Sequence, residues 1–230
     1  MKITSLGHSG FRIEIEDAVL LVDPWLTGNP VFPEIARAQA LSGATHILIS
    51  HGHGDHTADA LTIAKDHGIP IYCIHELSEL WGGMNGIDCV GFGKGGTVNA
   101  GNAQVSMVNA SHSSSLDGNG KVEAAGSEAG FMITGEGHRI YFSGDTDIMA
   151  DMDWLGDFYN PDIGILCCGG HYTMGMEGAA YAAKRYFNFK TVIPCHYKTF
   201  PILAQSAQPL VDALPDVDVK MPEVMETIDI

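Results

Sequence analysis

The stretch from residue 46 to residue 67 limits the fold more than any other part of this sequence. It opens with the apolar run His46-Ile-Leu-Ile-Ser50, continues through a short polar segment, and passes into Thr57-Ala-Asp-Ala-Leu-Thr-Ile-Ala-Lys-Asp-His67. A Thr at the start and Gly68 after the end are typical helix signals, while the apolar run is typical of a buried strand. A buried strand followed directly by a helix predicts an α/β fold with parallel strands.

Strands with a similar pattern occur on both sides of this unit. Apolar and polar residues alternate in Phe11–Glu16, and Ala18–Val22 is continuously apolar, as expected for an inner strand. A strand is also predicted at 104–109, in the middle of the chain. The second half repeats this order, with strands predicted at 130–134, 139–142, 163–168 and 191–195 and a helix at 177–187. Two such halves predict one α/β sandwich with helices outside. No linker divides the chain, so residues 1–230 are predicted to form a single domain.

The middle of the chain carries weaker signals. Helices are predicted at 34–41 and 76–81, and the glycine-rich segment 82–101 holds only short strand candidates. Residues 111–128 are predicted to form a long polar loop around Asp117-Gly-Asn-Gly120. The pattern of apolar residues constrains this region least.

Charge and cysteine content exclude several classes of protein. The 12 Lys and Arg against 28 Asp and Glu give a net charge of −16, the wrong sign for binding nucleic acid or an anionic membrane. No apolar run approaches the ~20 residues of a membrane helix, and Met1 does not open an export signal. Five Cys, an odd number, argue against a disulfide framework. The sequence predicts a soluble, cytoplasmic protein with a small-molecule substrate, and leaves open a homo-oligomer.

The segment between the strand and the helix carries the strongest chemical signal. It reads His51-Gly-His53-Gly-Asp55-His56, which places three imidazoles and a carboxylate within six residues. Two glycines allow the backbone to bend so that these side chains converge. Because imidazole and carboxylate together bind divalent transition metals, the segment predicts a metal site, and an incidental polar surface loop is the weaker alternative.

Three more candidates follow apolar strands elsewhere in the chain. His112 follows the strand at 104–109, Asp145 the strand at 139–142, and His196 the strand at 191–195. α/β proteins build their sites just beyond the carboxyl ends of strands. Each residue alone is more typical of a capping or core polar group, but as a set they complement the histidine-rich segment.

The order of these residues resembles the metallo-β-lactamase superfamily, whose His-x-His-x-Asp-His signature matches residues 51–56. Within it, the chain is similar to small bacterial and archaeal metal-dependent hydrolases close to the ascorbate-phosphate lactonases. The motifs that carry this similarity are Leu6-Gly-His-Ser9, Asp23-Pro24, Ser50-His-Gly-His-Gly-Asp-His56, His112-Ser-Ser-Ser115, Gly144-Asp-Thr146, Gly169-Gly-His-Tyr-Thr-Met174 and Cys195-His-Tyr197. They are specific for fold and metal, and less so for substrate.

The resemblance implies an αββα sandwich, two mixed sheets packed face to face with helices outside, and two divalent metal ions at one edge of the sheets. The implied ligands are His51, His53 and His112 for one ion, Asp55, His56 and His196 for the other, and Asp145 as a bridge between them. Zinc is the first choice, and manganese, nickel and iron also accept such ligands. Two ions of this kind supply hydroxide at neutral pH, so no protein nucleophile is required.

Further residues are predicted to act beside the ions. His8 and His171 lie on glycine-flanked turns, from which each could orient substrate or donate a proton; the alternative is that each only bonds loop backbone. Asp55 is assigned a catalytic role besides its role as a ligand. Asp23 ends a buried strand and is predicted to orient a ligating His. Lys198 would suit an anionic substrate, with a solvated lysine as the alternative.

These observations favour a metal-dependent hydrolase that cleaves an ester, lactone or phosphodiester bond of a small polar or anionic substrate. One alternative is a di-iron oxidoreductase on the same scaffold, which would favour a carboxylate where His53 stands. Another alternative is a non-catalytic metal-binding protein. An RNA-processing nuclease is disfavoured by the net charge of −16.

Overall fold

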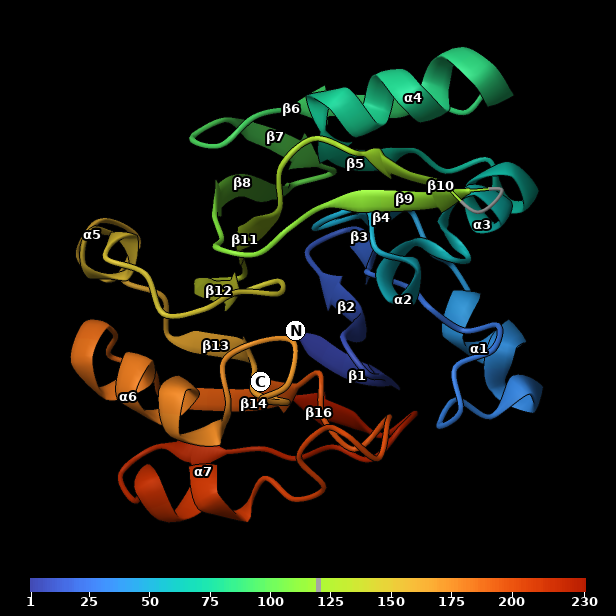
Figure 1. Ribbon diagram of the computed structural model, residues 1–230. Helices are drawn as coiled ribbons and strands as arrows, with labels where there is room; N and C mark the ends of the chain where they lie inside the picture. Colours follow the sequence, from blue (N-terminus) through green and yellow to red (C-terminus); the bar gives the residue numbers. More distant parts are fainter. Residues whose placement is uncertain (119–120) are drawn as a thin grey trace.

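Two seven-stranded sheets face each other in the computed structural model, which describes residues 1–118 and 121–230 (Figure 1). The first sheet contains, in spatial order, β16 (Thr227–Asp229), β1 (Lys2–Gly7), β2 (Gly10–Ile15), β3 (Ala18–Val22), β4 (His46–Leu48), β5 (Ile71–Ile74) and β6 (Cys89–Phe92). The second contains β15 (Asp218–Val219), β14 (Thr191–Cys195), β13 (Ile163–Cys167), β12 (His138–Phe142), β11 (Ala129–Gly135), β8 (Ala103–Asn109) and β7 (Thr97–Ala100).

The two sheets share one plan. In the first sheet β16, β1, β2 and β3 pair antiparallel, and β3, β4, β5 and β6 pair parallel. In the second, β7, β8, β11 and β12 pair antiparallel, and β12, β13, β14 and β15 pair parallel. The predicted α/β sandwich of two mixed sheets is therefore confirmed.

Helices lie outside the sheets, and α4 and α7 occupy opposite ends of the view in Figure 1. The helical elements are the 3-10 turn η1 (Glu34–Ala36), α1 (Arg37–Leu41), α2 (Gly54–Thr57), α3 (Ala60–His67), α4 (His75–Asn85), α5 (Asp151–Tyr159), α6 (Met176–Tyr186) and α7 (Gln208–Ala213). No helix in the described part of the chain is both long enough and apolar enough to cross a membrane.

Aromatic side chains from both sheets meet in the core between them. Phe11 of β2 lies against Phe142 of β12 with ring centroids 6.3 Å apart, and Phe92 of β6 lies against Phe131 of β11 at 6.4 Å. Every residue of β13 and β14 is buried, because these strands are covered on both faces. Their continuous apolar runs are the pattern from which inner strands are predicted.

A hairpin stands where the sequence predicts an unbroken polar loop at 111–128. It consists of β9 (Ser115–Gly118) and β10 (Lys121–Ala124), which pair antiparallel. Positions 119–120 of the predicted loop lie outside the described residues. All four residues of β10 are exposed, so no buried face imposes the apolar alternation by which a strand is recognised.

Helix α5 has no counterpart in the sequence prediction. It buries Met152 and Leu155, but Gly156 interrupts its pattern and lowers its helix propensity. The structure explains this glycine, because a Cβ at position 156 would overlap the carbonyl oxygen of Tyr186 at the end of α6. The residue that weakens the helix signal is the one that lets α5 approach α6.

Candidate metal centre

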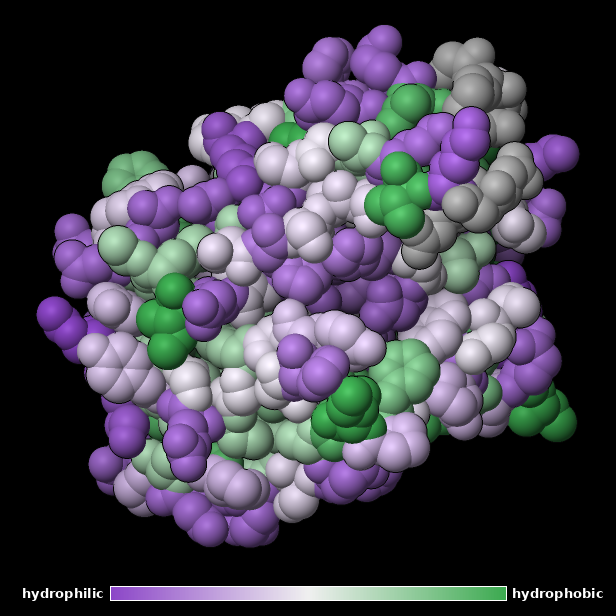
Figure 2. All heavy atoms as spheres, viewed as in Figure 1, coloured by the Kyte–Doolittle hydropathy of each residue, from purple (hydrophilic) through white to green (hydrophobic). Residues whose placement is uncertain are grey.

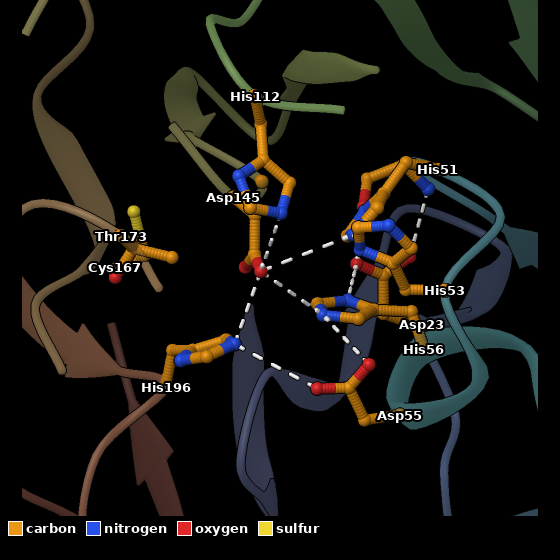
Figure 3. A network of polar contacts seen from close by, with 12 residues as sticks. Asp23, His51, His53, Asp55, His56, His112, Asp145, Cys167, Thr173 and His196 are labelled. Carbon is orange, nitrogen blue, oxygen red and sulfur yellow. Dashed lines mark hydrogen bonds and ion pairs between the residues drawn. The ribbon is translucent and has the colours of Figure 1, made fainter. Parts of the chain in front are cut away.

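Seven His and Asp side chains from the two sheets converge at one edge of the sandwich (Figure 3). Those from the first half of the chain are His51, His53, Asp55 and His56, which lie between β4 and the end of α2. Those that follow strands of the second sheet are His112, Asp145 and His196, after β8, β12 and β14. The structure thus brings together every residue that the superfamily resemblance names as a ligand.

The turn that carries the first group needs one of its two glycines. A Cβ at Gly52 would lie 2.7 Å from the Cβ of Ala125 and 2.8 Å from the carbonyl oxygen of Ser115. Only glycine lets this turn pass so close to the hairpin. Gly54, in contrast, has open space around it and begins α2, so steric crowding does not require glycine there.

Asp145 lies at the centre of the cluster and is only 2% exposed. Its Oδ2 atom lies 3.0 Å from Nε2 of His196, 3.4 Å from Nε2 of His56, 3.6 Å from Nε2 of His112 and 3.9 Å from Nε2 of His51. One carboxylate oxygen is therefore surrounded by four imidazole nitrogens, an arrangement suited to a carboxylate shared between cations.

The nitrogen and oxygen atoms form three compact groups, one of which joins Asp23, His51 and His56. In the other two, the atoms of His51, His53 and His112 lie within 4.8 Å of one another, and so do those of His8, Asp55, His56 and His196. Each of these two groups is compact enough to hold one divalent cation. Their composition agrees with the two implied ligand sets, and His8 is an addition to the second.

Asp23 fixes the orientation of two of the histidines and is completely buried. It accepts hydrogen bonds from the Ser50 backbone N–H at 2.8 Å, from Ser50 Oγ at 2.5 Å and from His56 Nδ1 at 2.8 Å. Because the Ser50 hydroxyl donates to Asp23, it accepts from His51 Nδ1 at 2.9 Å. Both imidazoles then hold a proton on Nδ1 and direct Nε2 at Asp145. That His56 and His51 are metal ligands oriented by Asp23 stays a prediction.

Three buried polar atoms of the candidate ligands lack a hydrogen bond. Nε2 of His56, Oδ1 of Asp145 and Nδ1 of His196 have no hydrogen-bond partner among the described residues. Burying a polar atom without a hydrogen-bond partner costs free energy of folding. Nε2 of His56 lies 3.4 Å from Oδ2, the other oxygen of the Asp145 carboxylate, so a cation bound there would interact with both side chains, and the site fits a metal ion.

In the absence of a metal ion, a proton on His56 supplies the positive charge beside Asp145. Burial alone would lower the pKa of His56, but Asp145 and Asp23 outweigh burial and raise this pKa well above its usual value. Burial acts against ionisation of Asp145 too, yet His56 and His196 hold its pKa well below the usual range. In His51 burial dominates and lowers the pKa, so this imidazole is neutral.

Metal binding is therefore expected to weaken as the pH falls. A cation must displace the proton on His56, which is bound at neutral pH because the pKa of this residue is raised. Below that pKa, the apparent affinity should drop about tenfold per pH unit for each proton displaced. Titration with Zn²⁺ against a competing chelator, with proton release counted, measures this. Equal affinity from about pH 6 to about pH 8 would contradict it.

His8 contacts a candidate ligand. Its Nε2 lies 3.0 Å from Oδ2 of Asp55, its Nδ1 lies 2.9 Å from Oγ1 of Thr199, and its carbonyl oxygen accepts a hydrogen bond from the His196 N–H. Burial lowers the pKa of His8 to about 4, although the bond to Asp55 acts in the opposite direction. A neutral, buried imidazole that holds Asp55 and Thr199 fits a positioning role better than direct proton donation.

Asp55 faces both His8 and the solvent. Burial raises its pKa, but the hydrogen bond from His8 and the nearby His56 lower it more, so the carboxylate stays ionised. Its side chain is 29% exposed and lines an open cleft. Asp55 is thus accessible to a substrate or water molecule while His8 holds it.

His171 does not join the cluster. It lies on an exposed loop, where its ring contacts that of Tyr172 at a centroid distance of 4.6 Å. The cleft is lined by Tyr172 instead, which lies on the same loop, between the bridged residues Gly169 and Gly175. A catalytic role for His171 has no contact in the described structure to support it.

An open cleft of about 450 Å³ gives access to the centre. Its lining residues are Trp25, His53, Gly54, Asp55, His112, Ser113, Asp145, Tyr172, His196 and Phe200. On the face in Figure 2, a hollow near the middle is bordered by hydrophilic residues. Sequence reasoning missed the three aromatic residues of this cleft. Trp25 directly follows Asp23-Pro24, and Tyr172 directly follows His171, so their neighbours in the sequence were a signal for both. No neighbouring motif pointed to Phe200.

Comparison with known proteins agrees with this geometry. A family model described as "Beta-lactamase superfamily domain" matches residues 19–197. The chain is 63% identical over 228 residues to a UPF0173 metal-dependent hydrolase of Paracoccus denitrificans (strain Pd 1222), covering 99% of both chains. A UPF0173 metal-dependent hydrolase of Dinoroseobacter shibae (strain DSM 16493 / NCIMB 14021 / DFL 12) is 63% identical over 230 residues, 100% of both.

A solved structure of a metallo hydrolase has a similar fold. Igni18, described as a novel metallo hydrolase from the hyperthermophilic archaeon Ignicoccus hospitalis KIN4/I, superposes with a TM-score of 0.87 at 30% identity. The match covers 99% of this chain and 97% of Igni18. The chain is therefore a member of the metallo-β-lactamase superfamily, within its family of metal-dependent hydrolases.

Proposed function

We propose that this chain hydrolyses an ester, lactone or phosphodiester bond of a small-molecule substrate at a centre that holds two divalent ions. The position of Asp145 carries the proposal, since its Oδ2 lies within 4 Å of Nε2 of four histidines. When bound, two such ions lower the pKa of a water molecule and withdraw charge from the bond under attack.

The chain's own residues hold and orient this centre. The proposed ligands are His51, His53 and His112 for one ion, Asp55, His56 and His196 for the other, and Asp145 for both. Asp23 keeps the proton of His56 on Nδ1, so that Nε2 faces the ion. His8 holds Asp55, whose exposed carboxylate can also orient water in the cleft. Zinc is the first candidate metal, followed by manganese, nickel and iron.

His53 favours hydrolysis over di-iron oxidation. A carboxylate at this position would suit iron, but an imidazole stands there, with its Nδ1 3.0 Å from Nε2 of His51. The net charge of −16 supports a small-molecule substrate as the partner, and neither a nucleic acid nor a membrane. All five cysteines are free, which supports a cytoplasmic location.

A hydrolysis screen on protein of measured metal content tests this function. Lactones, acyl esters and phosphodiesters are offered to the wild-type chain and to His53→Ala. The wild type should bind two ions and turn over at least one class. His53→Ala should lose one ion and about a hundredfold or more in kcat/KM, because its ion loses one of three imidazoles.

The matched control is His67→Ala, at the exposed end of α3 and outside the cluster. It should keep both ions and the activity of the wild type. If His53→Ala keeps both ions and full turnover, the ligand assignment is wrong. If the metal-loaded wild type hydrolyses no member of the screen, the proposed function fails.

A further inference from the structure

The cleft beside the metal centre has an aromatic wall. Trp25 and Phe200 stack with ring centroids 5.8 Å apart and an interplanar angle of 29°. Both rings also meet the His8 imidazole edge-on, at 5.4 Å and 5.6 Å. Since His8 is hydrogen-bonded to Asp55, Trp25 and Phe200 lie close to a candidate ligand.

Trp25 and Phe200 of this wall both line the cleft. The indole N–H of Trp25 donates to the carbonyl oxygen of Thr27 at 2.9 Å, so its one polar atom is already satisfied. Trp25 and Phe200 are only partly buried, and Tyr172, 56% exposed, adds a third ring to the lining. Partly buried aromatic faces at the mouth of a site bind flat apolar groups.

The cleft also lacks a positive side chain. None of its described lining residues is Lys or Arg. Lys198, two residues beyond His196, lines a separate pocket with Pro30, Pro33 and Pro222, and its Nζ lies 3.5 Å from Glu223. A phosphate or carboxylate on the part of a substrate that packs against this wall would therefore meet aromatic rings and no Lys or Arg among the described lining residues.

From this geometry we infer that the substrate is an uncharged carboxylic ester or lactone that carries an aromatic or apolar ring, which packs on Trp25 and Phe200. This inference rests on the proposed function and narrows it. In the reaction, the acyl C–O bond breaks, the hydroxyl of water is added to the acyl carbon, and its proton goes to the leaving oxygen. The products are a carboxylic acid and an alcohol from an ester, and a single hydroxy acid from a lactone.

Three methyl esters with the same reacting bond test the inference. They are methyl 3-phenylpropanoate, its charged analogue methyl 3-(4-carboxyphenyl)propanoate, and methyl butyrate, which has no ring. The wild-type chain should prefer the uncharged ring over the charged one and over methyl butyrate by about tenfold or more in kcat/KM. In Trp25→Ala and Phe200→Ala, the preference for the ring over methyl butyrate should fall about tenfold while metal content stays at the wild-type value.

The matched control is Phe158→Ala, which removes a Phe that is 72% exposed on α5 and not part of the cleft lining. It should keep the wild-type ratio of the two rates. Fluorescence gives a readout without turnover: 3-phenylpropanol should change the indole emission of the wild type but not that of Trp25→Phe.

The outcomes separate the inference from the proposed function. Equal or faster turnover of the charged ester overturns the inference, and so does an unchanged ratio in both alanine variants with their metal retained. Turnover of phosphodiesters alone also overturns the inference but leaves the proposed function intact. If the metal-loaded chain hydrolyses nothing in either set, both fail.

Discussion

Asp145→Asn is expected to reduce kcat/KM by about a thousandfold or more and to release at least one metal ion. The substitution keeps the shape of the side chain but removes the charge that faces four imidazole nitrogens within 4 Å. Loss of charge stabilisation worth several kcal/mol corresponds to a rate effect of this size. Metal analysis of the dialysed protein and initial rates on the best substrate of the screen measure both effects.

The structure offers a control two residues away. Asp147 is exposed, and its Oδ1 accepts a hydrogen bond only from the neighbouring Ile148 N–H among the described contacts. Asp147→Asn should keep both ions and full activity. If Asp145→Asn keeps two tightly bound ions, Asp145 does not bridge them.

Gly169→Ala is expected to lower the free energy of unfolding by about 3 kcal/mol and to weaken metal binding. A Cβ at this position would overlap the carbonyl oxygen of His196 and lie 3.3 Å from Nδ1 of the same residue. Backbone cannot yield as a flexible side chain does, so the connection after β13 or after β14 must move. Either movement displaces His196 from Asp145.

Thermal unfolding with and without added Zn²⁺, together with metal analysis, checks this expectation. The control is Gly93→Ala, where no atom lies within 4 Å of the added Cβ and the backbone φ is not positive. It should unfold at the wild-type temperature. A Gly169→Ala variant as stable as the wild type, with both ions, would mean that the backbone around His196 is not rigid.

The fold and the ligand cluster could be predicted because each depends on local patterns. Buried parallel strands produce continuous apolar runs such as Ile163–Cys167, and the candidate ligands follow the ends of such strands. The hairpin at β9 and β10 and the helix α5 were missed for opposite reasons. All four residues of β10 in the hairpin are exposed, whereas Gly156 of α5 allows a close contact with α6 but lowers the helix propensity.

Contacts made by loops could not be predicted. His8 has a left-handed backbone with φ 55°, a conformation that few non-glycine residues adopt and that no local pattern signals. This conformation accompanies the contact of His8 with Asp55. Likewise, on the loop between the bridged residues Gly169 and Gly175, Tyr172 lines the cleft while His171 remains outside, and no local sequence pattern distinguishes the two.

The seven candidate ligands come from both halves of the chain, so bound ions would cross-link the two sheets. Unfolding must then release them, and each site filled at a hundredfold excess of free metal over its dissociation constant adds about 2.7 kcal/mol to stability. Such a protein resists proteolysis when the cell is well supplied with its metal and is degraded faster when the metal is scarce. The amount of this protein in the cell would then rise and fall with the supply of the metal, even if its rate of synthesis stayed constant.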